Sequence, residues 1–263
     1  MVAGSDALVV RTAVEGGLRR WLRSYVMMMR FDVRGLGQWL MIGVIVQVLM
    51  GAGMAIMYGF YLGDMPEVAK VFLATGVPAL ALIPIGFVMV PNMVGQQRIA
   101  QTYDFIWSLP VPRLAAAAST FTVFTLMAVP GVATSLGVAV WNYDIDLTWS
   151  WTLIPAVLLT SLMTTSVGFG MAHAIENPVV INFIANMIIF FVLLFSPIVI
   201  PIEQFPDWLA SVHRVLPFYH MAVVIRDGLS DGLVSNVSTS YVVLGLWTAI
   251  GWAATAWVVG RRR

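Results

Sequence analysis

The chain has 263 residues, of which 60% are hydrophobic and 10% are charged, and its formal net charge is +1. Soluble domains average roughly 25% charged residues, so this composition excludes a sizeable soluble domain and indicates a membrane protein. The chain has no cysteine, and its only lysine is Lys70. This excludes disulfides, thiolate metal sites and a phosphate-binding GxxxxGK[ST] loop, so any ATP that drives the protein must bind to another polypeptide.

Residues 1–38 form a predicted cytoplasmic tail that contains an amphipathic helix lying in the membrane interface. Apolar side chains recur there at helical spacing, and they are Leu18, Trp21, Leu22, Tyr25, Val26 and Met29. Arginines occupy the other faces of this helix, where they can approach lipid headgroups. The helix serves either as a membrane anchor or as an elbow that also touches a cytoplasmic partner.

Residues 39–263 form a predicted permease domain of six membrane-spanning helices. About 20 apolar residues cross a bilayer as a helix, and uninterrupted runs of that length exclude a barrel. The expected fold is therefore all-α and polytopic. The six predicted spans are Trp39–Tyr61, Val71–Asn92, Leu114–Val140, Trp151–Ala174, Val179–Ile200 and Tyr241–Gly260.

The distribution of positive charge predicts the orientation of these spans. Eleven of the fourteen lysines and arginines lie in the tail, in the loop 93–113 and in the last three residues. Because basic residues accumulate on the cytoplasmic side, both termini and the loop 93–113 are predicted to be cytoplasmic. The opposite side holds eight of the acidic residues.

The loop 93–113 is too apolar for a simple solvated loop. Its apolar residues include Ile99, Tyr103 and Ile106 at helical spacing, and Pro110 would end a helix before the third span. Such a short helix either packs on a partner protein or lies on the bilayer or under its own bundle.

The segment 201–240, between the fifth and sixth spans, is a predicted external re-entrant region. About half of it is apolar, yet it contains no charge-free run long enough to span. Residues 218–225 would dip into the outer leaflet and return, which requires ends that are buried in protein or line a cavity.

These two segments, in this order on six spans, resemble the permease subunit of type-2 ABC exporters, a family that exports drugs, lipo-oligosaccharides and lipid-linked glycans. Members carry a loop of the form Gly-Thr-x-Glu-x-Leu-x-x-Ser/Thr-Pro-Val-x-Arg, and residues 102–113 read Thr-Tyr-Asp-Phe-Ile-Trp-Ser-Leu-Pro-Val-Pro-Arg. Asp104 stands for the glutamate, whereas Gln101 and Leu109 depart from the pattern. Residues 205–209 and 216–220, followed by Arg226, are also similar to the family.

The resemblance implies an ABC exporter in the bacterial cytoplasmic membrane. Two ATPase subunits would carry ATP and Mg²⁺, a second permease copy or a paralogue would complete the cleft, and this chain would itself bind no cofactor, no metal and no nucleic acid. The lipid membrane would surround it. The implied ATPase-coupling residues are Arg98, Thr102, Tyr103, Asp104, Phe105, Trp107 and Pro110. The implied external cap contains Trp208, Pro217, Tyr219 and Arg226.

A few polar side chains inside the spans are candidates for a substrate path, namely Gln47, Asn92, Asn182 and Asn186. Each can instead be hydrogen-bonding glue between helices. Asn182 and Asn186 share one face of the fifth span, which lines the path between subunits in the resembling family. The near absence of charge in the spans favours an amphiphilic or lipophilic substrate.

Two other classes of function fit the sequence less well. A stand-alone ion-coupled transporter needs a membrane-embedded acid or base, and the spans offer only His173, which with Glu176 forms either a protonatable pair or a satisfied loop pair. An intramembrane enzyme needs a polar catalytic cluster, and no such cluster is visible. The chain is therefore expected to be a non-catalytic transport subunit.

Overall fold

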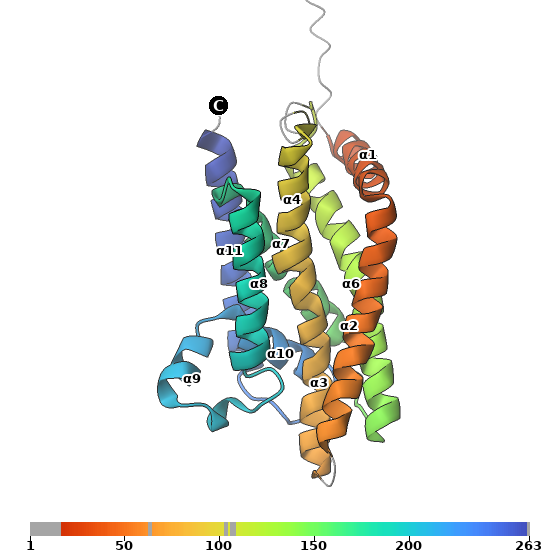
Figure 1. The fold of residues 1–263 in the computed structure, drawn as a ribbon, viewed down its shortest axis with the longest axis vertical. Coiled ribbons are helices and arrows are strands. Elements are labelled where there is room, and N and C mark those ends of the chain that lie inside the picture. Colours follow the sequence, from red (N-terminus) through yellow and green to blue (C-terminus); the bar gives the residue numbers. More distant parts are fainter. Residues whose placement is uncertain (1–16, 63–64, 103–104, 106–108, 262–263) are drawn as a thin grey trace, which may run out of the picture.

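A computed structural model of the chain describes residues 17–62, 65–102, 105 and 109–261. These residues form a helical bundle whose long helices run side by side along its long axis (Figure 1). The helices are α1 (Leu18–Leu36), α2 (Gln38–Leu62), α3 (Glu67–Pro84), α4 (Val90–Ile99), α6 (Arg113–Tyr143), α7 (Leu153–Ala174), α8 (Pro178–Phe195), α9 (Asp207–His213), α10 (Pro217–Asp227) and α11 (Val237–Arg261). A π-helical turn, η1 (Ile85–Met89), joins α3 to α4, and a short 3₁₀ turn, η2 (Ile202–Gln204), precedes α9.

Six of these helical stretches are long and apolar enough to cross a membrane, as the sequence predicts. The second extends from Glu67 to Ile99 and is therefore longer than the predicted Val71–Asn92. Pro84 and Pro91 interrupt the helical hydrogen bonding of this stretch, and the π turn between them absorbs the disruption without breaking the helix. As a result, the first seven residues of the predicted loop 93–113 belong to α4.

Helix boundaries elsewhere follow local sequence signals. The fifth span ends at Phe195 rather than at the predicted Ile200, because Ser196 precedes a proline and adopts an extended backbone. The sixth begins at Val237 rather than at Tyr241. Between them, α9 and α10 are bent by 73° relative to each other, and both lie within the segment 201–240 that was predicted as re-entrant.

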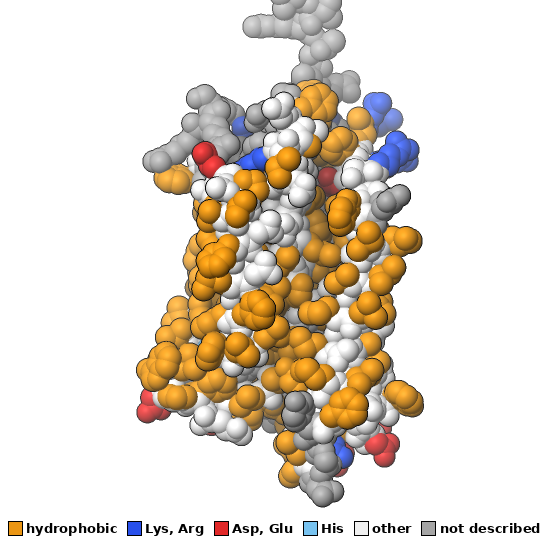
Figure 2. All heavy atoms as spheres, in the orientation of Figure 1, with side chains coloured by type: hydrophobic (Ala, Val, Ile, Leu, Met, Phe, Trp, Pro, Cys, Tyr) orange, Lys and Arg blue, Asp and Glu red, His pale blue; other side chains and the backbone are white. Residues whose placement is uncertain are grey.

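Charged side chains gather at the two ends of the bundle, and hydrophobic side chains cover the middle (Figure 2). We call one end the arginine-rich end; it carries the arginines of α1 together with Arg98 and Arg113. The other is the acid-rich end, where α9 and α10 lie (Figure 1). Its acidic residues include Glu67, Asp144, Glu203, Asp207 and Asp227.

Glycines allow the helices to approach closely in the core. A Cβ atom at Gly51 in α2 would overlap the carbonyl oxygen of Gly131 in α6. Close backbone contact of this kind is how membrane helices gain van der Waals packing when lipid supplies no hydrophobic driving force between them. The second span, Glu67–Ile99, is the most buried of the six and lies at the centre of the bundle, and α7 packs between it and α11.

Candidate functional site

The acid-rich end is organised around Arg226, which is only 1% exposed. Its guanidinium donates hydrogen bonds from Nε to Thr75 Oγ1 (3.1 Å) and from a terminal nitrogen to the carbonyl oxygens of Phe72 (3.1 Å) and Ile198 (2.7 Å). It also lies over the Phe72 ring, 3.6 Å from the centroid. Arg226 therefore joins α10 to α3 and to the turn after α8.

This junction depends on the sequence of α3. Gly76 has no side chain, and a Cβ there would overlap the Ile198 carbonyl oxygen, so glycine lets the turn after α8 reach α3. Thr75 lies in the same helix. Its hydroxyl donates to carbonyl groups of the preceding turn and accepts a hydrogen bond from Arg226. The sequence patterns identified Arg226 but not Thr75 or Gly76. These residues are far apart in the chain, and no sequence motif links residues that meet only in the folded junction.

The other predicted cap residues occupy different environments. Pro217 is buried at the first turn of α10, and Trp208 on α9 is exposed. Tyr219 is partly buried, with its ring edge-on to His220. His220, which was not predicted, bridges Ser240 Oγ in α11 and the Arg214 carbonyl oxygen, each at 2.9 Å. The predicted cap is thus a hydrogen-bonded assembly of α9, α10 and the start of α11.

The predicted path residues separate into two groups. Gln47 is fully buried and donates from Nε2 to the Ala81 carbonyl oxygen (2.9 Å), so it links α2 to α3. Asn92 donates to the Val88 carbonyl oxygen within its own helix. The Gln47 contact is of the interhelical kind that the glue alternative describes, whereas the Asn92 contact stays within one helix.

Asn182 and Asn186 lie on the outer surface of α8. Asn186 is exposed, Asn182 is partly exposed, and the Asn186 side-chain amide donates to the Asn182 carbonyl oxygen at 2.7 Å. An exposed amide on a span of otherwise apolar residues is unfavourable against lipid. This face of α8 is therefore suited to a subunit interface or a polar path.

The loop 93–113, which we call the predicted coupling loop, lies at the arginine-rich end. Arg98 in α4 donates to the Ile175 carbonyl oxygen beyond α7, and Thr102 Oγ1 donates to the Gln97 carbonyl oxygen (3.3 Å). Two apolar side chains of this segment face outward: Ile99 is 64% exposed and Phe105 is 59% exposed. Tyr103, Asp104 and Trp107 lie outside the described residues.

Helix α1 is held against α6 by polar contacts. Tyr25 donates to Thr122 Oγ1 (2.9 Å), and Asp32 accepts from Ser119 Oγ and from Thr120 Oγ1. Burial raises the pKa of the Asp32 carboxyl above its ordinary value, and the two hydrogen bonds oppose this shift only in part. Sequence analysis did not single out Asp32, since a buried aspartate and an exposed one look alike in sequence.

Helix α1 also contacts the coupling loop, because Arg20 donates to the Pro110 carbonyl oxygen (3.2 Å). The end of the loop is thus connected to α1 by a side chain and to α6 by the continuous backbone. His173 at the end of α7 is buried, and its Nδ1 contacts the Phe169 carbonyl oxygen at 2.8 Å. Among the described residues, no three His, Asp or Glu side chains are grouped as a metal site would require.

The model of a family described as ABC-2 type transporter matches residues 25–229, which is most of the chain and extends from Tyr25 in α1 to the end of α10. No curated protein matches the chain.

Proposed function

We propose that the chain exports an amphiphilic or lipophilic substrate. It belongs to the ABC-2 type transporter family, which is the permease domain of type-2 ABC exporters, and it is therefore the multi-pass membrane subunit of an ABC transporter. The substrate class would be a drug, a lipid or a lipid-linked glycan. Permeases of this family work with ABC ATPase subunits. The proposal assigns two such subunits, with their ATP and Mg²⁺, to the arginine-rich end, on the cytoplasmic side of a bacterial inner membrane.

The exposed apolar side chains of Ile99 and Phe105 carry this proposal. They are exposed at a polar end of the bundle, where exposed apolar side chains gain free energy when a protein partner covers them. Phe105 lies within residues 102–113, which resemble the coupling motif of the family, and Ile99 precedes that segment in α4. An ATPase surface that covers these side chains would grip the loop.

Motion of the loop would pass into the bundle through two contacts. Arg98 ties the end of α4 to the α7–α8 connection at Ile175, and Arg20 ties Pro110 to α1. Closure of the ATPases would displace the loop and, with it, the helices that surround the transport path. In such coupling, ATP binding to the ATPases changes the free-energy difference between two conformational states of the permease.

A second permease copy or a paralogue would face α8. Its exposed surface carries Phe183, Met187, Phe190 and Leu194 beside Asn186. The mixture of apolar and amide groups suits a passage for an amphiphile between two subunits better than it suits lipid alone.

The proposal is tested by purifying the tagged chain from its native membrane in mild detergent and measuring the co-purified ATPase subunit and its ATP hydrolysis. We expect the wild-type chain to retain an ATPase. The double variant Ile99→Ala, Phe105→Ala removes two contacts worth about 1–3 kcal/mol each, so it should retain at least tenfold less.

Trp151→Ala is the matched control, because Trp151 is a large apolar side chain, 86% exposed, at the opposite end of the bundle. This variant should retain the ATPase as the wild type does. Absence of any ATPase from the wild-type preparation would contradict the proposal and favour a stand-alone ion-coupled transporter.

A further inference from the structure

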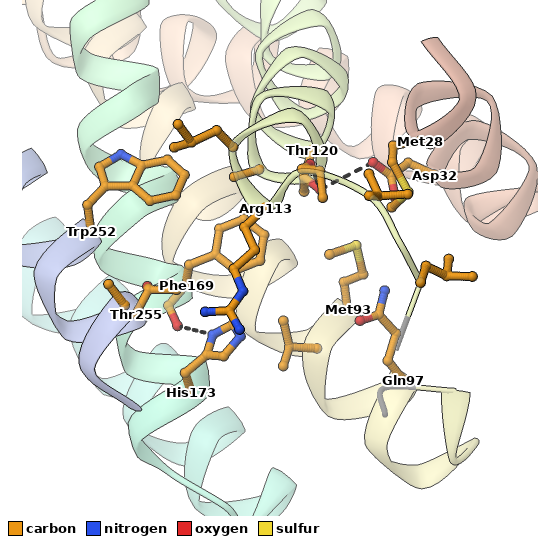
Figure 3. A pocket seen from close by; sticks show the side chains of 17 residues that line it. Met28, Asp32, Met93, Gln97, Arg113, Thr120, Phe169, His173, Trp252 and Thr255 are labelled. Carbon is orange, nitrogen blue, oxygen red and sulfur yellow. Dashed lines mark hydrogen bonds between the residues drawn. The ribbon is translucent and has the colours of Figure 1, made fainter. Parts of the chain in front are cut away.

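A cavity of about 370 Å³ opens at the arginine-rich end, inside a single copy of the chain. Residues of α1, α4, α6, α7 and α11 line it, and Figure 3 shows their side chains converging on one space. Ligand pockets in proteins have volumes of roughly 300–1,000 Å³, so the cavity has the size of a binding site.

One wall of the cavity carries a buried carboxylate. Asp32 is 7% exposed, and its two hydrogen bonds, from Ser119 and Thr120, both end on Oδ2. Oδ1 therefore has no hydrogen-bond donor within the described part of the chain. A carboxylate oxygen beside a cavity and without a donor is a site for a cationic N–H group.

The opposite wall carries a cation. Arg113, the first residue of α6, extends its guanidinium into the cavity toward His173, across from Asp32 (Figure 3). No ion pair joins Asp32 to Arg113 in the described structure, and the partners of the Asp32 carboxylate are hydroxyl groups. The cavity thus holds a negative and a positive group that do not neutralise each other.

The rest of the wall is largely apolar. Met93, Phe169 and Trp252 contribute a thioether and two aromatic rings to the cavity wall (Figure 3). The cavity lies where α4 ends and α6 begins, which places it near the level of lipid headgroups when the bundle spans a bilayer. Tryptophan is enriched at that level because its ring is amphipathic.

We propose that this cavity binds the zwitterionic headgroup of a phospholipid, with a primary ammonium on Asp32, the phosphate on Arg113 and the beginning of the acyl chains against Phe169 and Trp252. Opposite charges on two walls match opposite charges in one headgroup. A purely anionic lipid would engage Arg113 but would leave Asp32 unpaired and repelled. The site belongs to one subunit and does not depend on the proposed ATP-driven export.

The test is a lipid titration of the purified full-length chain, followed by native mass spectrometry, with phosphatidylethanolamine and phosphatidylglycerol as the two probes. The wild-type chain should bind phosphatidylethanolamine about tenfold more tightly, which is the effect of one charge-assisted hydrogen bond. Asp32→Asn should abolish this preference, because it removes the partner of the ammonium and also relieves the repulsion of phosphatidylglycerol. Arg113→Gln should weaken binding of both lipids.

Two controls complete the test. Arg34→Gln removes an exposed arginine of α1 that does not line the cavity, and it should change neither affinity. Soluble phosphoethanolamine should bind far more weakly than the lipid, because it lacks the chains that contact the apolar walls. Equal affinity of the wild type for the two lipids, an unchanged preference in Asp32→Asn, or binding of soluble phosphoethanolamine as tight as that of the lipid would overturn the proposal.

Discussion

Replacement of Arg226 by methionine should destabilise the acid-rich end of the bundle. Methionine is similar in length to the aliphatic part of arginine and keeps its packing, but it donates no hydrogen bond. The change leaves the Ile198 carbonyl oxygen without the guanidinium nitrogen that lies 2.7 Å from it. Thr75 can still donate to carbonyl groups in its own helix, so the loss concentrates on the turn after α8.

The magnitude follows from two opposing effects. Three hydrogen bonds from a charged donor contribute about 1.5–3 kcal/mol each, which gives roughly 5–9 kcal/mol. Removing a buried guanidinium relieves a desolvation cost of several kcal/mol, since no carboxylate compensates it among its described contacts. We therefore expect a net loss of about 2–4 kcal/mol in the free energy of unfolding.

The assay is thermal unfolding in detergent, followed by tryptophan fluorescence. A loss of that size should lower the midpoint by about 5–15 °C for a chain of this length. Arg214→Met is the matched control, because the Arg214 side chain is exposed in the same external segment, and the midpoint should stay within about 2 °C of the wild type. In a double-mutant cycle, Thr75→Val should cost about 1 kcal/mol less in the Arg226→Met background than in the wild type.

The reasoning is refuted if Arg226→Met unfolds at the wild-type temperature. It is also refuted if Arg214→Met is destabilised equally, because the effect would then arise from net charge rather than from the buried contacts.

Three further predictions concern orientation, pH and packing. Because the chain has no cysteine, an introduced single cysteine reports on which side of the membrane its position lies. Trp151→Cys should react with a membrane-impermeant maleimide in intact cells, whereas Ile99→Cys should react only after permeabilisation. The reverse pattern would contradict the predicted orientation. The raised pKa of Asp32 means that the folded chain holds this proton more tightly than the unfolded chain, so the wild-type protein loses stability as pH rises from the unfolded pKa through the folded pKa. Asp32→Asn should therefore unfold at a higher temperature than the wild type at pH 7, and this difference should shrink toward pH 4. A difference in unfolding temperature that widens on acidification would contradict the prediction. Gly51→Ala should destabilise the bundle by about 1–3 kcal/mol, because the new Cβ would overlap a carbonyl oxygen of α6. Gly53→Ala, whose Cβ would have no atom within 4 Å, should be neutral or stabilising. Equal thermal unfolding midpoints for the two variants would exclude the close contact.

Sequence alone predicts the helical membrane architecture well, because hydrophobic length is a local property. The six spans lie near their predicted positions, and the differences arise at prolines and at turns. The extension of the second span to Ile99 depends on a π turn that accommodates Pro84 and Pro91, and hydropathy does not reveal such a turn. The family resemblance is confirmed by the family match over residues 25–229.

The internal contacts could not be predicted in the same way. Asp32 and Ser119 are far apart in the chain, and only the packing of α1 on α6 brings them together. The same holds for Arg226 and Thr75. For Gln47 the sequence left two alternatives open, a substrate path or hydrogen-bonding glue between helices, and the folded chain places it in a buried contact with α3. The roles proposed for the coupling and path residues remain predictions.

Photocrosslinking from position 99 tests the central claim most directly. A benzophenone maleimide attached to Ile99→Cys, in the cysteine-free chain and in native membranes, would react with whatever covers the coupling segment. We predict a crosslinked polypeptide that contains a GxxxxGK[ST] motif, and addition of ATP should change its yield. Crosslinks to lipid alone, with no nucleotide-binding protein at this position, would contradict the assignment of the arginine-rich end as the ATPase-docking surface.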